Sequence, residues 1–235
     1  MKRIAFITDV HLDEQFPLDN MVNPQKNLER VVEDILNRKI EHIVFGGDIG
    51  AATAHQWFFD RLKHFSTQIV LGNHDTFKDV TLFFKKDETQ EELYYQEENE
   101  HYKFIFLDTS LEVLSPAQLE WLRVNLVTDK KVVLFIHHPV LEVDTPVDTL
   151  YPLKNRETIQ SLLMESGQNI TIFCGHYHMN DEQKIENIRQ IVTQSLSFQL
   201  IKNADDIKID NSNFGYRIMT FDADKIDTQL VEFTS

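Results

Sequence analysis

Five short apolar runs in this chain each end in potential metal ligands, and this repetition limits the possible fold more than any other feature. The runs end at Asp9-Val10-His11, Asp48, Asn73-His74-Asp75, His137-His138 and His176-Tyr177-His178. An apolar run of this length is typical of a buried strand. Because ligands in α/β sheets bind beyond the carboxyl ends of strands, the five endings predict one site at one edge of a sheet.

Helical patterns separate these runs, which is typical of the α/β class. We expect strands at residues 4–7, 42–45, 68–71, 102–107, 131–136 and 170–174, and helices at residues 24–39, 53–65, 115–126 and 155–166. Asn23 and Ser115 are predicted N-caps, since each precedes a proline that suits the first helical turn. Beyond Asp181 the pattern changes to successive strand-like segments at 184–195, 213–222 and 225–234. They predict a second, more antiparallel sheet packed on the first.

The 235 residues suffice for one large domain or two small ones, and no repeat, low-complexity tract or Pro/Gly/Ser-rich linker divides them. We therefore expect residues 1–235 to form a single domain. The longest polar stretch, residues 85–92, is expected to be a solvated loop or helix end. No run approaches the ~18 apolar residues of a membrane span, and residues 4–7 are too few for a signal peptide. A cytoplasmic protein with no membrane partner is expected, in an oligomeric state that the sequence does not determine.

The net charge of −15 limits the choice of partners. Non-specific binding of nucleic acid depends on Lys and Arg that neutralise phosphates, so a chain this acidic repels long DNA or RNA. A small phosphate compound can still bind where metal ions supply local positive charge. The single cysteine, Cys174, has apolar neighbours and is expected to be a small buried hydrophobe.

The chemistry of the run endings indicates a metal site. Carboxylate, amide oxygen and imidazole suit Mn, Fe or Zn rather than copper(I) or an iron–sulfur cluster. The candidates outnumber the ligands of one ion, which predicts two divalent ions ~3.5–4 Å apart, the usual arrangement for phosphoester hydrolysis. Five of the seven glycines flank the same endings, namely Gly46, Gly47, Gly50, Gly72 and Gly175. Glycine permits tight turns and close backbone approach there.

The motifs resemble, in this order, those of the calcineurin-like metallophosphoesterase superfamily. They are Asp9-Val10-His11, Gly47-Asp48, Gly72-Asn73-His74-Asp75, His137 and Gly175-His176-Tyr177-His178, and they span about three quarters of the chain. The pattern is most similar to the class III cyclic-nucleotide and glycerophosphodiester phosphodiesterases. The resemblance implies two packed mixed β-sheets flanked by helices, a four-layer sandwich.

The resemblance also implies the metal ligands. One ion would be held by Asp9, His11 and His178, the second by Asn73, His137 and His176, and both by Asp48. Since His138 directly follows His137, the sequence does not decide which of the two is the ligand, and we take the first.

Three further residues would act around the metal ions. His74 would face the substrate, either as general acid for the leaving oxygen or as a clamp on the phosphate. Asp75 would support the ligands from behind. His138 would contact the substrate or simply pack.

The activity that the resemblance implies is hydrolysis of a small phosphodiester or phosphomonoester, with the diester favoured. A hydroxide bridging the two ions would attack phosphorus in line. Two alternatives are a non-catalytic scaffold that keeps the fold for protein contacts, and a nuclease. The complete ligand set and His74 argue against the scaffold, and the negative charge argues against the nuclease.

Overall fold

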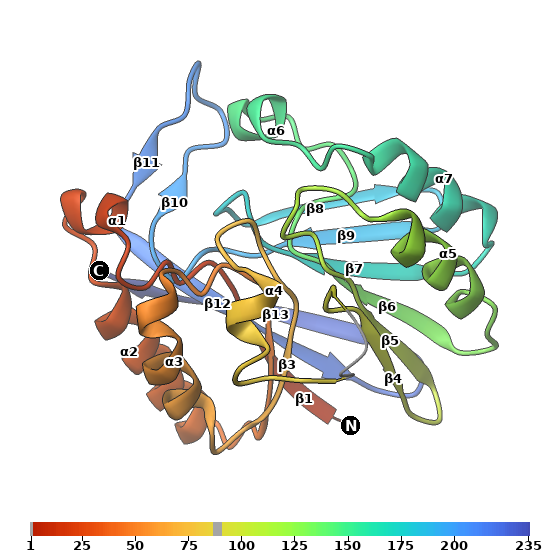
Figure 1. Ribbon diagram of the computed structural model, residues 1–235, viewed down its shortest axis with the longest axis horizontal. Helices are drawn as coiled ribbons and strands as arrows, with labels where there is room; N and C mark the ends of the chain where they lie inside the picture. Colours follow the sequence, from red (N-terminus) through yellow and green to blue (C-terminus); the bar gives the residue numbers. More distant parts are fainter. Residues whose placement is uncertain (1, 87–90) are drawn as a thin grey trace.

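The computed structural model describes residues 2–86 and 91–235 and places their longer strands in two mixed sheets (Figure 1). The first sheet has the order β13 (Ile226–Thr234), β12 (Asn213–Phe221), β1 (Lys2–Ile7), β2 (His42–Phe45) and β3 (Ser66–Ile69). The second has the order β4 (Tyr95–Glu98), β5 (Tyr102–Phe106), β6 (Lys131–Phe135), β7 (Ile170–Cys174), β9 (Ile188–Val192) and β8 (Asp181–Ile185). A short hairpin joins β10 (Gln199–Leu200) to β11 (Ile209–Asp210). Residues 87–90, within the polar stretch expected as a loop or helix end, lie outside the described residues.

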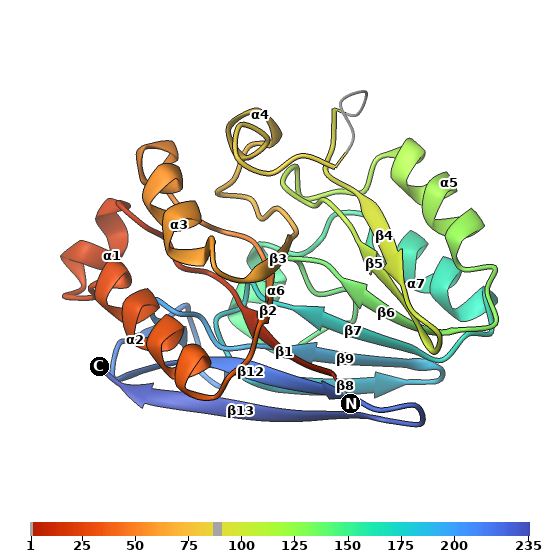
Figure 2. The same cartoon turned by 90° about the horizontal axis from the view of Figure 1, so that it is seen from below.

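Helices lie on the outer side of each sheet (Figure 2). On the side of the first sheet they are α1 (Gln15–Asp19), α2 (Pro24–Asn37), the 3₁₀ turn η1 (Ala52–Ala54) and α3 (His55–Leu62), followed in the chain by α4 (Phe77–Val80). On the side of the second they are α5 (Pro116–Asn125), α6 (Pro146–Leu150) and α7 (Arg156–Glu165). Within the described ranges, no helix is long and apolar enough to cross a membrane.

Both predicted N-caps are confirmed. The Asn23 side chain accepts a hydrogen bond from the backbone N–H of Lys26 at 3.0 Å, and the Ser115 hydroxyl accepts one from Gln118 at 3.1 Å. Each bond satisfies a donor of the first helical turn that has no partner inside the helix.

The core between the sheets contains a group of packed aromatic rings. The Phe6 ring of β1 lies 6.0 Å from Phe135 of β6 and 6.1 Å from Phe173 of β7, so these side chains join the two sheets. Successive residues of a strand point to opposite faces. Leu134 therefore faces away from Phe135 and packs in the second apolar cluster, with the helices α5 and α7. The predicted architecture of two packed mixed sheets flanked by helices is confirmed.

The C-terminal strands do not form a sheet of their own, so that prediction is wrong. β12 pairs antiparallel with β1, opposing Met219 to Ile4, while β8 and β9 extend the second sheet. The segment 184–195 is also not one strand, because Glu186 has a positive φ of 49° in a turn between β8 and β9. Both β1 and the C-terminal strands β12 and β13 thus belong to the first sheet.

Candidate metal centre

Parallel pairing brings the ligand-bearing strand ends together. β1, β2 and β3 are parallel neighbours in the first sheet, and β6 and β7 are parallel neighbours in the second. Among the described residues, donor atoms within 4.8 Å of one another form three groups here, namely His11, Glu14 and His74 at the pocket and two further clusters. One is Asp9, His11 and His178, and the other is Asp48, His137 and His176. The structure therefore brings together all six of these predicted ligands, three in each cluster.

Asp48 lies between the two clusters. Its Oδ2 is 3.2 Å from Nε2 of His137 and 3.7 Å from Nε2 of His11. Its other oxygen accepts a hydrogen bond from the backbone N–H of His74 at 2.9 Å. A single carboxylate oxygen within reach of both groups is the geometry that a bridging ligand requires.

Hydrogen bonds to backbone carbonyls orient the imidazoles. Nδ1 of His137 donates to Gly46 at 2.7 Å and Nδ1 of His178 donates to Phe198 at 2.9 Å. A carbonyl only accepts, so these nitrogens carry the protons and the Nε2 lone pairs face the cluster. His176 is reversed, since its Nε2 donates to the carbonyl of Tyr151 at 3.0 Å and its Nδ1 is left as the donor atom. This arrangement leaves one ring nitrogen of each histidine facing the centre, as a metal ligand requires.

Two buried polar atoms of the centre form no hydrogen bond with any described residue. They are Nε2 of His137 and the side-chain oxygen of Asn73. Leaving a buried acceptor without a partner costs about 1–3 kcal/mol. A bound cation would satisfy both, so the donor set fits divalent metal ions.

The backbone bends sharply at the ligands. Five of them have a positive φ, namely Asp9 (56°), His11 (55°), Asp48 (63°), His176 (66°) and His178 (46°). Side-chain-bearing residues rarely adopt this conformation, although Asp and His do so more often than most, and it persists at functional sites where the surroundings enforce it. Gly72 and Gly175 give the carboxylates room, since an added Cβ would lie 2.1 Å from the Asp48 Oδ1 and 2.3 Å from the Asp9 Oδ2.

Both central carboxylates are ionised although they are buried. Burial alone would raise the pKa of Asp9, but the charges of His178 and His137 outweigh burial and lower it to about 2. The pKa of Asp48 is likewise held well below its usual range, against burial, chiefly by His137. Two buried negative charges require nearby positive charge. Among the described residues that line the adjoining pocket, none is a lysine or arginine.

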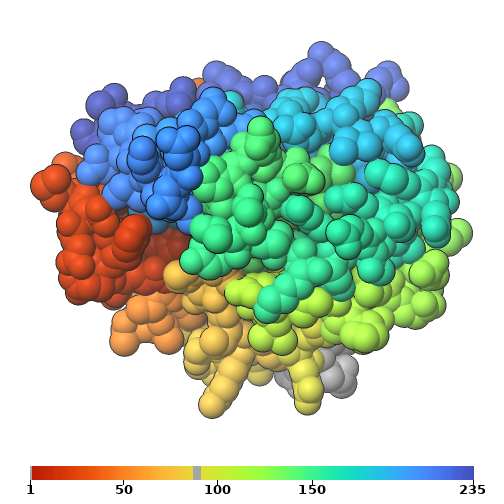
Figure 3. All heavy atoms as spheres, turned by 90° about the horizontal axis from the view of Figure 1, so that it is seen from above, coloured from red at the N-terminus to blue at the C-terminus, as the bar shows by residue number. Residues whose placement is uncertain are grey.

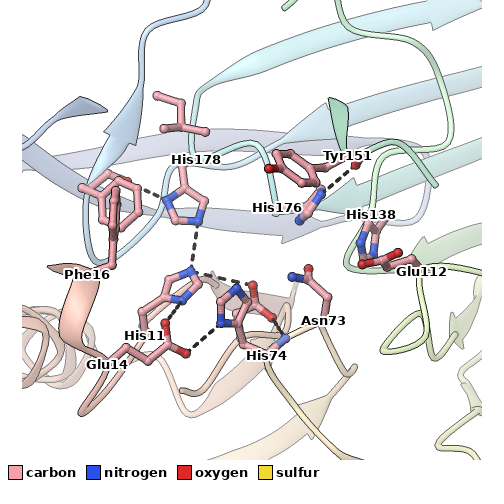
Figure 4. Close-up of a pocket in the computed structure, with 13 residues that line it drawn as sticks. His11, Glu14, Phe16, Asn73, His74, Glu112, His138, Tyr151, His176 and His178 are labelled. Atoms are coloured by element: carbon pink, nitrogen blue, oxygen red, sulfur yellow. Dashed lines mark hydrogen bonds and ion pairs between the residues drawn. The ribbon is translucent and has the colours of Figure 1, made fainter. Parts of the chain in front are cut away.

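Glu14 is a residue of the site that sequence analysis missed. Its two carboxylate oxygens lie 2.9 Å from Nδ1 of His11 and 2.9 Å from Nδ1 of His74 (Figure 4). Burial opposes its ionisation, but the hydrogen bonds to both histidines lower the pKa of Glu14 to about 2. The same hydrogen bond raises the pKa of His74 to about 9. Glu14 follows a motif but matches none, so the sequence contains no signal for it.

Asp75 and His138 lie beside the clusters. The Asp75 carboxylate accepts backbone hydrogen bonds from Asp48, Ile49 and Gly72 at 2.8 to 3.0 Å. It thereby ties the loop after β2, which carries Asp48, to the loop after β3. The His138 ring lies 4.0 Å from that of His176, and its Nδ1 is 2.9 Å from the Thr109 hydroxyl.

A pocket of about 240 Å³ opens above the metal centre. Phe16 of α1 and Phe198, just before β10, line one side, while Tyr151 and Glu112 lie on the other (Figure 4). The segment that contains α6 and the β10–β11 hairpin lie close together on the surface (Figures 1 and 3). The pocket is large enough for a small organic phosphate and leaves its mouth open to solvent.

Comparison with known proteins is consistent with this centre. A family model described as calcineurin-like phosphoesterase superfamily domain matches residues 1–198. A probable cyclic nucleotide phosphodiesterase from Xenorhabdus bovienii is 25% identical, covering 97% of this chain and 99% of that protein. The 3′,5′-cyclic adenosine monophosphate phosphodiesterase CpdA of Vibrio vulnificus is 27% identical over 99% of this chain and 90% of its own length. A probable glycerophosphodiester phosphodiesterase, GpdQ, from Arcobacter nitrofigilis is 28% identical, covering 74% of this chain and 71% of that protein.

Solved structures share the fold at low sequence identity. A dimetal phosphatase from Danio rerio superposes with a TM-score of 0.63 at 12% identity, covering 99% of this chain and 98% of that one. GAP50, the anchor in the inner membrane complex of Plasmodium, superposes with a TM-score of 0.64 at 15% identity, covering 98% of this chain and 84% of that one. The same fold therefore occurs in a phosphatase and in an anchor protein, and the site residues must decide between such functions.

Proposed function

The chain belongs to the calcineurin-like phosphoesterase superfamily, and from this premise we propose that it hydrolyses a small phosphodiester in the pocket above Asp48. The observation that carries the proposal is the position of Asp48 between two clusters of buried donor atoms. The names of the relatives, cyclic nucleotide and glycerophosphodiester phosphodiesterases, support a small diester over a monoester. The net charge of −15 disfavours long nucleic acids as substrates.

We propose two divalent ions, Mn, Fe or Zn, as cofactors. Asp9, His11 and His178 would hold one ion, Asn73, His137 and His176 the other, and Asp48 both. When bound, such ions neutralise charge on the phosphoryl oxygens and make water a nucleophile at neutral pH. The choice of His137 over His138 is supported by orientation, because His137 reaches Asp48 while His138 is 2.9 Å from a threonine hydroxyl.

The protein's own residues supply the remaining steps. His74 stands at the pocket with its Nδ1 bonded to Glu14, so its Nε2 is the nitrogen that can donate a proton to a leaving oxygen. Glu14 keeps the ring in place and favours its protonated form. The scaffold alternative is not favoured, because a protein used only for contacts would not need this complete set of oriented donors.

A substrate panel tests the proposed function. Protein loaded with Mn²⁺, Mg²⁺, Fe²⁺ or Zn²⁺ is assayed on cyclic nucleotides, glycerophosphodiesters, bis-p-nitrophenyl phosphate and phosphomonoesters. We expect hydrolysis of diesters with at least one metal, at a higher kcat/KM than for monoesters. If no ester is hydrolysed with any metal, the scaffold becomes the better explanation, and a preference for monoesters would contradict the diester assignment.

Metal content at saturation provides a second test. We expect about two ions per chain after reconstitution with Mn²⁺, since the donors exceed one coordination sphere. Elemental analysis of dialysed protein measures the ratio, and calorimetric titration of metal-free protein shows whether binding occurs in two steps. Saturation at one ion per chain would rule out the dinuclear centre.

A further inference from the structure

The side of the pocket next to His11 and His178 is aromatic. The Phe198 ring lies 4.6 Å from the ring of His178 and 6.0 Å from that of His11. Phe16 packs edge-on against Phe198 with ring centroids 5.3 Å apart. Phe198 is buried, whereas Phe16 is 55% exposed and lines the pocket. An aromatic surface exposed beside the metal ligands gains free energy if a ligand covers it.

The opposite side of the pocket is polar. Glu112 lines it and forms an ion pair with Lys154 at 2.7 Å, and His138 lines it with a buried Nε2 that has no hydrogen-bond partner among the described residues. Tyr151, 58% exposed, completes this side. The two sides therefore differ. The ring of Tyr151 stands beside the charged Glu112 and the polar His138, whereas Phe16 and Phe198 pack together into an apolar aromatic surface that complements a flat apolar group.

The position of His74 restricts how a diester can lie in the pocket. The leaving oxygen must face the proton donor His74, whose side chain is 43% exposed at the pocket. The phosphoryl oxygens face the clusters around Asp9 and Asp48. The second ester group, which stays on the phosphate, is then directed to one of the side walls.

We propose that Phe16 is a specificity-determining residue that stacks on a flat, aromatic group of the retained ester, as a nucleobase or an aryl ring would present. This inference rests on the proposed function, since it assigns an ester group within the same diester. Stacking on an aromatic side chain is sequence-tolerant and depends only on a π-face. The wild-type protein should therefore bind aryl and nucleoside diesters more tightly than alkyl diesters with the same leaving group.

The test compares two diesters that release the same p-nitrophenolate. Bis-p-nitrophenyl phosphate retains an aryl ring, and methyl p-nitrophenyl phosphate retains a methyl group. With Phe16→Ala we expect the KM for the aryl diester to rise about 5- to 20-fold, which is ~1–2 kcal/mol at 1.4 kcal/mol per tenfold. The kcat, and the KM for the methyl diester, should stay within about twofold, the sign of lost binding rather than lost catalysis. Phe16→Trp should restore the low KM.

Leu18→Ala is the matched control. Leu18 lies on the same helix α1 and is 52% exposed, but it does not line the pocket, so its replacement should leave both KM values unchanged. Calorimetry with phenylphosphonate and methylphosphonate gives a readout without turnover, and Phe16→Ala should weaken only the phenyl compound. An equal rise in KM for both diesters, or no rise for either, would overturn the proposal. Failure of the wild-type protein to hydrolyse either diester would instead count against the proposed function.

Discussion

Asp48→Asn is expected to lower kcat/KM for phosphodiester hydrolysis by about 10³-fold or more, because metal ions contribute several kcal/mol of transition-state stabilisation and each 1.36 kcal/mol is tenfold in rate. The Asp48 Oδ2 lies 3.2 Å from His137 of one cluster and 3.7 Å from His11 of the other, which is the closer approach to both, since the Asp9 Oδ1 is 3.2 Å from His178 but 3.8 Å from His137. Asn keeps its size and accepts a positive φ readily, so the backbone at φ 63° should be unchanged. The substitution removes only the negative charge that Asp48 would place between the two ions. Kinetics and metal content measured on the same preparation check this expectation.

Asp60→Asn is the control for the loss of one charge. Asp60 is exposed on α3, and its one side-chain hydrogen bond to a described residue is accepted from Gln56 at 3.2 Å, so this variant should match the wild type in activity and metal content. The melting temperature of each metal-free variant shows whether folding is affected. His11→Ala should be milder than Asp48→Asn at high metal concentration, because Asp9 and His178 remain on that ion. Near-wild-type turnover by Asp48→Asn would contradict the bridging role.

His74→Asn is expected to keep the metal ions but to lose about 10²–10⁴-fold in kcat on substrates with a poor leaving group. The reason is that an alkoxide must be protonated as it leaves, whereas p-nitrophenolate departs as a stable anion. The loss should therefore be large for an alkyl ester or a ribose 3′-oxygen and small for bis-p-nitrophenyl phosphate. The ratio of the two losses is the measured quantity, with elemental analysis of the same protein.

Glu14→Gln separates orientation from proton donation. Gln can keep one hydrogen bond in place of the carboxylate that holds His11 and His74, both at 2.9 Å. The Glu14→Gln variant should show the same dependence on the leaving group as His74→Asn, with a smaller loss of kcat. His64→Asn, on an exposed histidine after α3, serves as the control. Equal losses of His74→Asn on both substrates with full metal content would make His74 a phosphate clamp, and loss of one metal ion would make it a ligand.

The sequence was sufficient to predict the fold class, the candidate ligands and the strands that lead to them, whereas β4, β10 and β11 were not predicted. The ends of β1, β2, β6 and β7 could be read from local pattern, because a buried strand is continuously apolar and its first polar residues mark where it leaves the sheet. The two N-caps were predictable for the same reason, because Asn23 and Ser115 each form a hydrogen bond within one helical turn. Motif order then identified the family before any contact was known.

The pairing of the C-terminal strands depended on tertiary contacts. The pattern of residues 213–222 predicts a strand, but no local sequence feature predicts that β12 pairs with β1 rather than with β9. Strand partners are chosen by which apolar faces can be buried together, and this is a property of the whole chain. The turn at Glu186 was missed for a related reason, because the apolar alternation continues on both sides of it.

The sequence by itself determined the candidate metal ligands, and only the tertiary structure decided how they are oriented and which other side chains join them. Ligand type and spacing are local, so Asp9, Asp48 and His137 were predictable. The atom that each presents depends on partners distant in the chain, such as the carbonyl of Gly46 that turns the His137 Nε2 inward. The role of Glu14 depends on the tertiary structure alone. Glu14 is part of no motif, and its carboxylate contacts His74 only because the loop after β3 approaches the loop after β1. Charge and hydrogen bonding act between residues that are distant in the chain, so they leave no periodic pattern in a sequence.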